Sequence, residues 1–230
     1  MSEYTHLHDS TIFLFLPRKI YYNFAPMMMK SIALNKIPQK SIREFIQDQM
    51  NNNVHTLNDV RSTYKEGDDL SDHLFHEEIY TLSYPMSKVW EHYVKANPNE
   101  VWNGKMMSFG LMISKNEDEV MYVGEKYSEV KVGQIFYINL NIFGLVKVAV
   151  SHEVIAVDPE KNYFELSYVE GGKSVGKQRI SFFETSDGHT RIVHSTYYKS
   201  DSSFRDKYIY PYFHTKVIGE YHGNMENSLV

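Results

Sequence analysis

The sequence predicts an α+β fold in which a curved antiparallel sheet of about seven strands wraps around one long C-terminal helix. Three observations lead to this prediction. The chain after Gly104 reads almost wholly as β-strand, short turn sequences separate the strands, and residues 203–228 carry a continuous helical stripe. Because parallel strands need long crossovers, strands joined by short turns are expected to be antiparallel.

An irregular N-terminal extension over residues 1–75 precedes a predicted domain over residues 76–230. Its best-marked helix starts at a capping box, Ser41-Ile-Arg-Glu44, followed by apolar residues at helical spacing. Pro26 stands at the first position of an earlier short helix. The extension is therefore expected to hold a strand-like piece and two short helices, over residues 11–16, 27–34 and 41–50.

The regular part of the chain begins at residues 76–84, which alternate as a strand does. Pro85 then opens a helix that carries Trp90, and a second short helix or turn leads to Trp102. Turns rich in Gly, Asp and Asn separate the segments that follow. The strands expected next cover residues 106–114, 119–124, 134–141, 145–157, 162–170, 174–185 and 190–200.

The closing helix is expected over residues 203–228. Its stripe recurs at helical spacing and consists of Tyr210, His214, Val217, Ile218, Tyr221 and Met225. A strongly curved sheet has a concave face that needs cover, and one long helix can lie across it. The interior between them is either filled by side chains or hollow, and a hollow interior is a ligand site of the usual apolar kind.

Composition excludes several classes of function. The chain has 230 residues, 24 Lys and Arg against 29 Asp and Glu, and no cysteine. Without cysteine there is no disulfide, thiol nucleophile or Cys-ligated metal centre. A net charge of −5 without a basic block argues against a nucleic-acid partner. No apolar run approaches the roughly 20 residues of a membrane span, so a soluble, cytoplasmic protein without integral membrane association is expected.

Several segments form a pattern of strand, Pro-initiated helix with a Val-Trp pair, late hairpin and closing helix. They are Tyr84-Pro-Met-Ser-Lys-Val-Trp90, Trp102, Gly176 to Phe183, Asp187 to Val193 and the helix after Arg205-Asp206. Over residues 76–230 the chain thereby resembles the START-like, or helix-grip, superfamily, which includes birch-pollen-allergen-like, polyketide cyclase/dehydrase-like and lipid-transfer proteins. The resemblance implies a ligand-binding fold, and members bind sterols, lipids, hormones or polyketides, while a few are enzymes. Likeness of fold alone does not choose between these activities.

Strand alternation assigns one face of each late strand to the interior. Polar side chains stand among the apolar residues of these inner faces, and the closing helix adds two more from above. The charged opposite faces, such as Lys147 and Glu153, are expected to meet water. The predicted ligand-binding residues are His152, Tyr168, Gln178, His194, Tyr210 and His214.

Three functions stay open for this set of residues. The first is binding of a small hydrophobic ligand (a lipid, polyketide or aromatic metabolite) that the polar residues orient. The second is a cyclase- or dehydratase-type enzyme, in which a cavity His or Tyr acts as general acid or base. The third is an interaction domain with a filled core, in which each polar residue bonds a neighbour as buried polar groups usually do and residues 1–75 form the partner surface.

The sequence indicates neither a metal site nor a cofactor. His214 and His222 lie eight residues apart, about 12 Å along a helix, which is too far for two ligands of one zinc ion. Gly171-Gly172-Lys173-Ser174 lacks the spacing of a phosphate-binding loop. The expected partner is a small apolar or amphipathic molecule.

Overall fold

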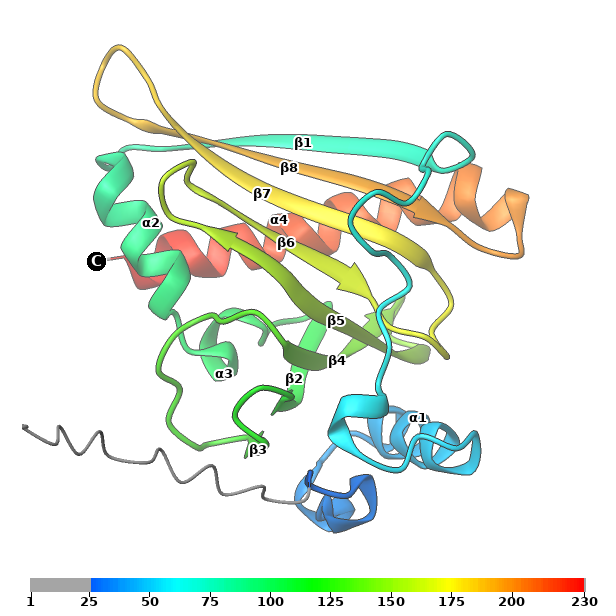
Figure 1. Cartoon of the computed structure of the whole chain (residues 1–230). Helices are drawn as coiled ribbons and strands as arrows, with labels where there is room; N and C mark the ends of the chain where they lie inside the picture. The colour runs from blue at the N-terminus through cyan, green and yellow to red at the C-terminus, as the bar shows by residue number, and fades with distance from the viewer. Residues whose placement is uncertain (1–25, 230) are drawn as a thin grey trace, which may run out of the picture.

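The computed structural model describes residues 26–229, in which a long C-terminal helix crosses one antiparallel sheet (Figure 1). The α+β prediction is confirmed, with eight strands in the described residues where about seven are expected. The strand-like piece expected over residues 11–16 lies outside the described residues. The strands are β1 Leu74–Leu82, β2 Met107–Ser114, β3 Glu119–Tyr122, β4 Gln134–Ile142, β5 Val146–Asp158, β6 Tyr163–Tyr168, β7 Val175–Glu184 and β8 Thr190–Lys199.

The strand order is β1-β8-β7-β6-β5-β4-β2-β3, and all neighbours are antiparallel. Hairpins join β4 through β8 in sequence order, as the short turns predict. Strand β1 instead lies at one edge of the sheet and pairs with β8, the last strand of the chain. In this pairing Glu78 stands opposite His194. Bulges at Phe109/Leu111 and Val154/Ala156 interrupt the register, and such bulges bend and twist a sheet.

Two short helices connect β1 to β2 and close one end of the sheet. α2 spans Met86–Lys95 and α3 spans Pro98–Val101, which confirms the helix after Pro85 and the short helix before Trp102. Trp90 packs edge-on against Phe182, with ring centroids 5.5 Å apart. Trp102 stacks on Tyr221 of the C-terminal helix at 4.2 Å.

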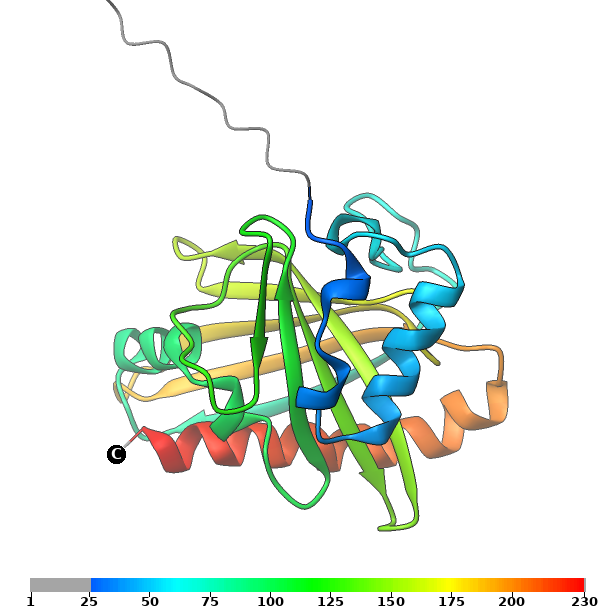
Figure 2. The ribbon, with the colours of Figure 1, turned by 90° about the horizontal axis from the view of Figure 1, so that it is seen from below.

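The C-terminal helix, α4, spans Tyr210–Ser228 and follows a π-helical turn, Arg205–Ile209. The buried carboxylate of Asp206 accepts hydrogen bonds from the backbone N–H and the hydroxyl of Ser200, at 2.6 and 2.7 Å. Near the other end, Glu220 accepts the backbone N–H groups of Lys105 and Met106 at 2.6 and 2.8 Å. These contacts hold α4 across the inner face of the sheet (Figure 2).

The inner face of the sheet and α4 share the larger hydrophobic core. Strand alternation predicts this face correctly for β5 to β8. Its buried members include Val154, Phe164, Leu166, Ile180, Phe182, Ile192, Ile218 and Met225. No helix within residues 26–229 is both long and apolar enough to cross a membrane.

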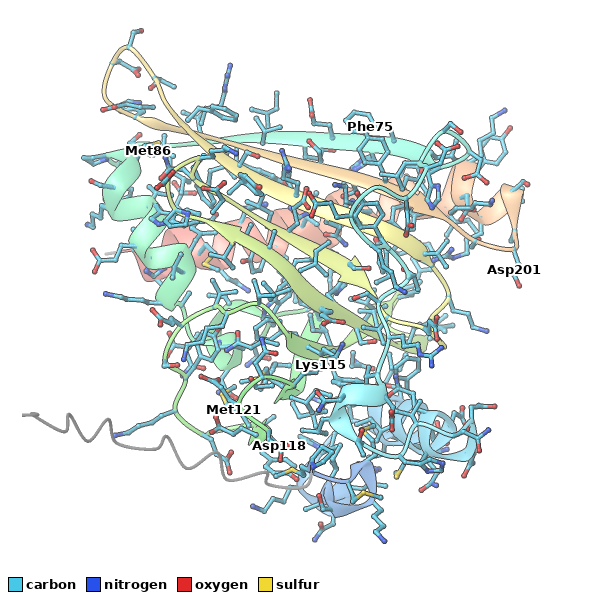
Figure 3. All side chains as sticks on the ribbon, viewed as in Figure 1. Phe75, Met86, Lys115, Asp118, Met121 and Asp201 are labelled. Carbon is cyan, nitrogen blue, oxygen red and sulfur yellow. The ribbon has the colours of Figure 1, made fainter. Side chains whose placement is uncertain are left out.

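The extension covers the opposite, outer face of the sheet and forms a second core there. Helix α1, Lys40–Asn51, packs against β4 and β5, and Figure 2 shows it lying beside these strands. Asp118 of the β2–β3 turn, labelled in Figure 3, accepts a hydrogen bond of 2.6 Å from the backbone N–H of Met27, which links the extension to this turn. The buried apolar members of this second core are Met29, Ile32, Ile37, Ile42, Ile46, Leu57, Val60, Leu111, Ile113, Ile135, Tyr137 and Val169.

Two local predictions for the extension are wrong. Residues 27–34 do not form one helix, because the backbone at Ile32 is extended, and two 3₁₀ turns, Met29–Ser31 and Leu34–Lys36, stand in its place. Ser41 does not cap α1 either, since the helix begins at Lys40. The Ser41 hydroxyl instead donates to the side-chain oxygen of Asn139 on β4 at 2.7 Å. At Ser41, contact with the sheet has replaced the expected cap.

The expectation that the charged outer faces meet water is also wrong for part of the sheet. Glu153 is only 8% exposed, and both its oxygens lie 2.8 Å from the ammonium group of Lys115. It also accepts the Ser62 hydroxyl at 2.6 Å. The extension covers this face, and a covered carboxylate needs a paired cation and hydrogen bonds. Lys147, beyond the covered area, is exposed as expected.

Candidate functional site

A cavity of about 110 Å³ lies between the inner face of the sheet and α4. Leu140, Val150 and Ile218 contribute to its largely apolar wall, and Arg205 and Phe213 line it from the α4 side. An engineered cavity of about 150 Å³ lined by apolar side chains holds benzene. Side chains therefore fill most of the interior and leave room on the scale of a small ring.

Five of the six predicted site residues line this cavity: His152, Tyr168, Gln178, Tyr210 and His214. His194 is fully buried but does not line it. It lies behind Gln178, between that residue and α4. The structure therefore brings all six together, five at the cavity wall and one in the layer that supports it.

Gln178 is the centre of the polar part of the wall. Its Nε2 group donates to Nε2 of His152 and to the hydroxyl of Tyr168, each at 3.0 Å. Its Oε1 atom accepts from Nε2 of His194 at 2.8 Å. The Tyr168 hydroxyl in turn hydrogen-bonds the Tyr210 hydroxyl. One amide thereby connects β5, β6, β7, β8 and α4.

The network continues into two residues that the sequence interpretation missed. Nδ1 of His194 lies 2.9 Å from Nε2 of His222 on α4, and Nδ1 of His222 lies 2.8 Å from the Tyr93 hydroxyl on α2. His222 stands eight residues after His214, near the same face of the helix, and that spacing is the signal that could have identified it. Tyr93 gives no such signal, because its contact depends on how α2 docks.

The orientation of the Gln178 amide fixes which of its two polar atoms donates and which accepts. The tautomer of each neighbouring histidine then follows from the hydrogen bonds that its two ring nitrogens make. Oε1 of Gln178 accepts, so neutral His194 carries its proton on Nε2 and accepts at Nδ1. His222 must then donate from Nε2 and accept the Tyr93 proton at Nδ1. On the other side, Nε2 of His152 accepts from Gln178, which places the His152 proton on Nδ1.

Burial keeps these groups uncharged. Desolvation lowers the pKa of His152 to about 4 and the pKa of His222 to about 3. Burial, with neighbouring histidines adding to it, holds the pKa values of His194 and His214 well below the ordinary value. For Tyr168, burial raises the pKa to about 12. The site therefore presents neutral donors and acceptors near neutral pH.

A second chain of hydrogen bonds runs from the cavity wall to the edge strand β1. Nδ1 of His214 lies 3.1 Å from Nδ1 of His76, and Nε2 of His76 lies 3.0 Å from the Thr215 hydroxyl. That hydroxyl donates to Glu78 at 2.7 Å. The chain connects a cavity histidine to a half-buried carboxylate through groups that can each pass a proton.

A larger depression of about 630 Å³ lies on the outer face, between the extension and strands β5 to β7. Charged residues dominate its lining, and its two buried carboxylates are each neutralised by cations. Glu153 pairs with Lys115, and Glu165 pairs with Lys177 and Arg179 at 2.9 and 2.7 Å. The inner cavity is the better candidate site because it combines apolar walls with a small set of convergent polar groups.

Within the part of the chain that the structure describes, no three His, Asp or Glu side chains converge in an arrangement suited to a metal ion. His214 and His222 each pack edge-on against His194, with ring centroids 5.7 and 5.2 Å away. Their role in the described structure is hydrogen bonding within the networks above.

No known protein-family profile matches the chain, and no curated protein sequence matches it. Solved structures do match its fold. A point mutant of norcoclaurine synthase from Thalictrum flavum, in complex with a transition-state analogue, has a TM-score of 0.52 at 15% identity, with 68% of this chain and 94% of that chain covered. The same enzyme in complex with dopamine and hydroxybenzaldehyde has a TM-score of 0.51 at 14% identity, with 72% and 94% covered.

Major latex-like protein 151 from Panax ginseng also matches, with a TM-score of 0.51 at 13% identity, covering 69% of this chain and 98% of that chain. At such identities the likeness establishes the fold alone. The matches span these smaller proteins almost end to end, and the described chain has the same features of a curved antiparallel sheet closed by a C-terminal helix. The chain therefore has a helix-grip fold.

Proposed function

We propose that the protein binds a small, largely apolar ligand, such as an aromatic or polyketide metabolite or part of a lipid, in the cavity between the sheet and α4. The observation that carries the proposal is the cavity itself, an apolar chamber with one polar patch centred on Gln178. Its volume of about 110 Å³ is on the scale of a single small ring.

Apolar burial supplies most of the binding free energy in this proposal, at roughly 25 cal/mol for each Å² removed from water. The polar residues orient the ligand. Because Gln178, His152 and Tyr168 already hold one another in place, little side-chain freedom is lost when a ligand binds. The helix-grip protein norcoclaurine synthase, in complex with dopamine and hydroxybenzaldehyde, is a precedent for single-ring ligands.

Native mass spectrometry of the protein purified from its own host tests this proposal. We expect a bound small molecule to leave on mild activation. Val150→Phe would fill the cavity from β5 and should abolish the adduct. Val146→Phe makes the same change at an exposed position of the same strand and should leave it intact. Equal adducts in both variants would contradict the proposal.

An acid–base enzyme is the second candidate, and the chain of His214, His76, Thr215 and Glu78 favours it. In this reading His214 removes a proton from a ligand carbon next to a carbonyl and passes its other proton along the chain toward Glu78. The carbon later regains a proton from the same chain, so that charge balances.

Exchange of the α-hydrogens of cyclohexanone in D₂O, followed by NMR, tests the enzyme candidate. Protein should accelerate the exchange beyond buffer, and His76→Phe should remove the acceleration because it interrupts the chain. His55→Phe, at an exposed position of the extension, is the matched control. Exchange no faster than in buffer would exclude this candidate for simple ketones.

A further inference from the structure

We infer that the cavity selects uncharged ligands that present a hydrogen-bond-accepting oxygen, such as a ketone or aldehyde carbonyl, to donors supplied by His152 and the Tyr168–Tyr210 pair. This inference rests on the proposed function, because it names the chemical class of ligand for the same cavity. It follows from counting the protons and lone pairs in the network around Gln178.

The first spare donor is on His152. Its Nε2 atom accepts from Gln178, so the neutral ring carries its proton on Nδ1. Nδ1 of His152 is buried and has no hydrogen-bond partner among the described residues. Among the residues that line the cavity, it is the one buried side-chain nitrogen or oxygen atom without a described partner. A buried polar group of this kind costs about 1–3 kcal/mol of stability unless a partner satisfies it.

The second spare donor is a tyrosine hydroxyl. Tyr168 accepts from Nε2 of Gln178, and the Tyr168 and Tyr210 hydroxyls hydrogen-bond each other. The pair carries two hydroxyl protons, and only one can lie between the two oxygens. The other proton has no acceptor in the network, and both tyrosines line the cavity.

Acceptors, in contrast, are already used. The acceptor nitrogens of His152, His194 and His222 each take a proton from within the network, and Oε1 of Gln178 takes the proton of His194. A carbonyl oxygen has two lone pairs and can accept from both spare donors, whereas a ligand that only donates finds no free ring nitrogen on these three histidines. Nδ1 of His214, the remaining imidazole at the wall, contacts His76, and its Nε2 atom lies 3.5 Å from the Thr196 hydroxyl.

The charge of the site favours neutral ligands. Arg205 is the cation that lines the cavity. Its Nη1 atom pairs with the Asp206 carboxylate at 3.1 Å, and its Nη2 atom donates a hydrogen bond to the Ser174 hydroxyl at 2.7 Å. The imidazoles stay neutral because burial lowers their pKa values. A carboxylate ligand would therefore enter an apolar chamber without an unpaired cation, which is costly.

NMR of the unliganded protein tests the first step without any ligand. Long-range ¹H–¹⁵N correlation spectra report which ring nitrogen of each histidine carries the proton. We expect the Nδ1–H tautomer for His152 and the Nε2–H tautomer for His194 and His222. An Nε2–H tautomer or an imidazolium at His152 would overturn the inference.

Titration with two isosteric probes tests the second step. Cyclohexanone and methylenecyclohexane have the same ring and differ only in C=O against C=CH₂. We expect cyclohexanone to bind about tenfold more tightly, the effect of one satisfied buried hydrogen bond. His152→Phe should weaken this preference, because only the tyrosine donor is left, and His189→Phe, at an outward position of the β7–β8 turn, should retain it in full.

The possible outcomes separate the two proposals. Equal affinity for both probes would overturn the carbonyl inference and leave ligand binding in the cavity standing. Absence of binding by either probe would count against the proposed function as well. If His152→Phe does not fold, the tautomer spectra and the two affinities of the unmodified protein still decide the inference.

Discussion

Gln178 is the residue on which the geometry of the site depends. A side-chain amide offers a donor on one atom and an acceptor on the other, so it can join two neutral histidines of opposite tautomer. A carboxylate in its place would accept from both sides and would require the His152 proton on Nε2. The neighbours of Gln178 therefore have defined hydrogen-bonding directions at the cavity wall.

The buried histidines lead to a pH prediction. Their folded-state pKa values lie below the ordinary value of 6.5, at about 4 for His152 and about 3 for His222. The unfolded chain therefore binds more protons between pH 6.5 and pH 4, and stability must fall as the pH falls through that window. Each such histidine should cost about 2 kcal/mol between pH 7 and pH 5.

Urea unfolding at pH 7, 6 and 5 measures this dependence. In the His152→Phe variant, the loss of unfolding free energy between pH 7 and pH 5 should be smaller by the contribution of one histidine, about 2 kcal/mol. A free energy of unfolding that is equal at pH 7 and pH 5 would show that these imidazoles are not held neutral by the fold.

Much of the site could be predicted at the level of single residues. Alternation along β5 to β8 identifies His152, Tyr168, Gln178 and His194 because side chains of successive strand residues point to opposite faces. It could not identify His76 or Tyr93 as neighbours. Their contacts depend on pairing of β1 with β8 and on docking of α2, which are long-range features without a local sequence pattern.

Among the elements, the strands and α2, α3 and α4 were predictable because each carries its own apolar period or turn chemistry. The extension was less so. Ser41 matches a capping box in sequence, yet its hydroxyl bonds Asn139, and the capping box in the described structure is formed by Thr56 and Asp59. Tertiary contacts can replace a local signal when a helix end packs on a sheet.

The contact between α1 and the sheet requires a glycine. A Cβ atom on Gly110 would lie 2.3 Å from Cδ1 of Ile42 and 3.3 Å from the backbone oxygen of Tyr137. We expect Gly110→Ala to lower the free energy of unfolding by about 1–3 kcal/mol, as overpacking does.

Gly223 provides the matched control on α4. A Cβ atom there meets nothing within 4 Å, so Gly223→Ala should stabilise the protein by about 0.5–1 kcal/mol through helix propensity. Equal effects of the two substitutions in chemical denaturation would contradict the close packing of α1 on β2.

In the whole molecule, the sheet has a core on each face. The inner core with α4 could be predicted from the sequence pattern, but docking of the extension on the outer face could not. The outer face carries charged residues such as Glu153 and Glu165, which by their sequence are expected to meet water. Those carboxylates are paired beneath or beside the extension. The division at residue 75 stays a prediction, and we propose that the described part of the extension unfolds together with the sheet.

Hydrogen exchange can test that proposal. Ile46 of α1 is fully buried in the outer core, and Ile46→Ala should cost about 2–4 kcal/mol. If the molecule is one cooperative unit, protection of amides in α1 and in β4 should fall by the same amount. Loss confined to α1, or an equal loss in the exposed control Gln47→Ala, would contradict it.

The most direct test of ligand binding in the inner cavity is a crystal structure of the protein soaked with cyclohexanone. We expect density for one ring between Val150 and Ile218, with the carbonyl oxygen facing His152 and the Tyr168–Tyr210 pair. An empty inner cavity, with the probe only on the surface or in the outer depression, would contradict the account.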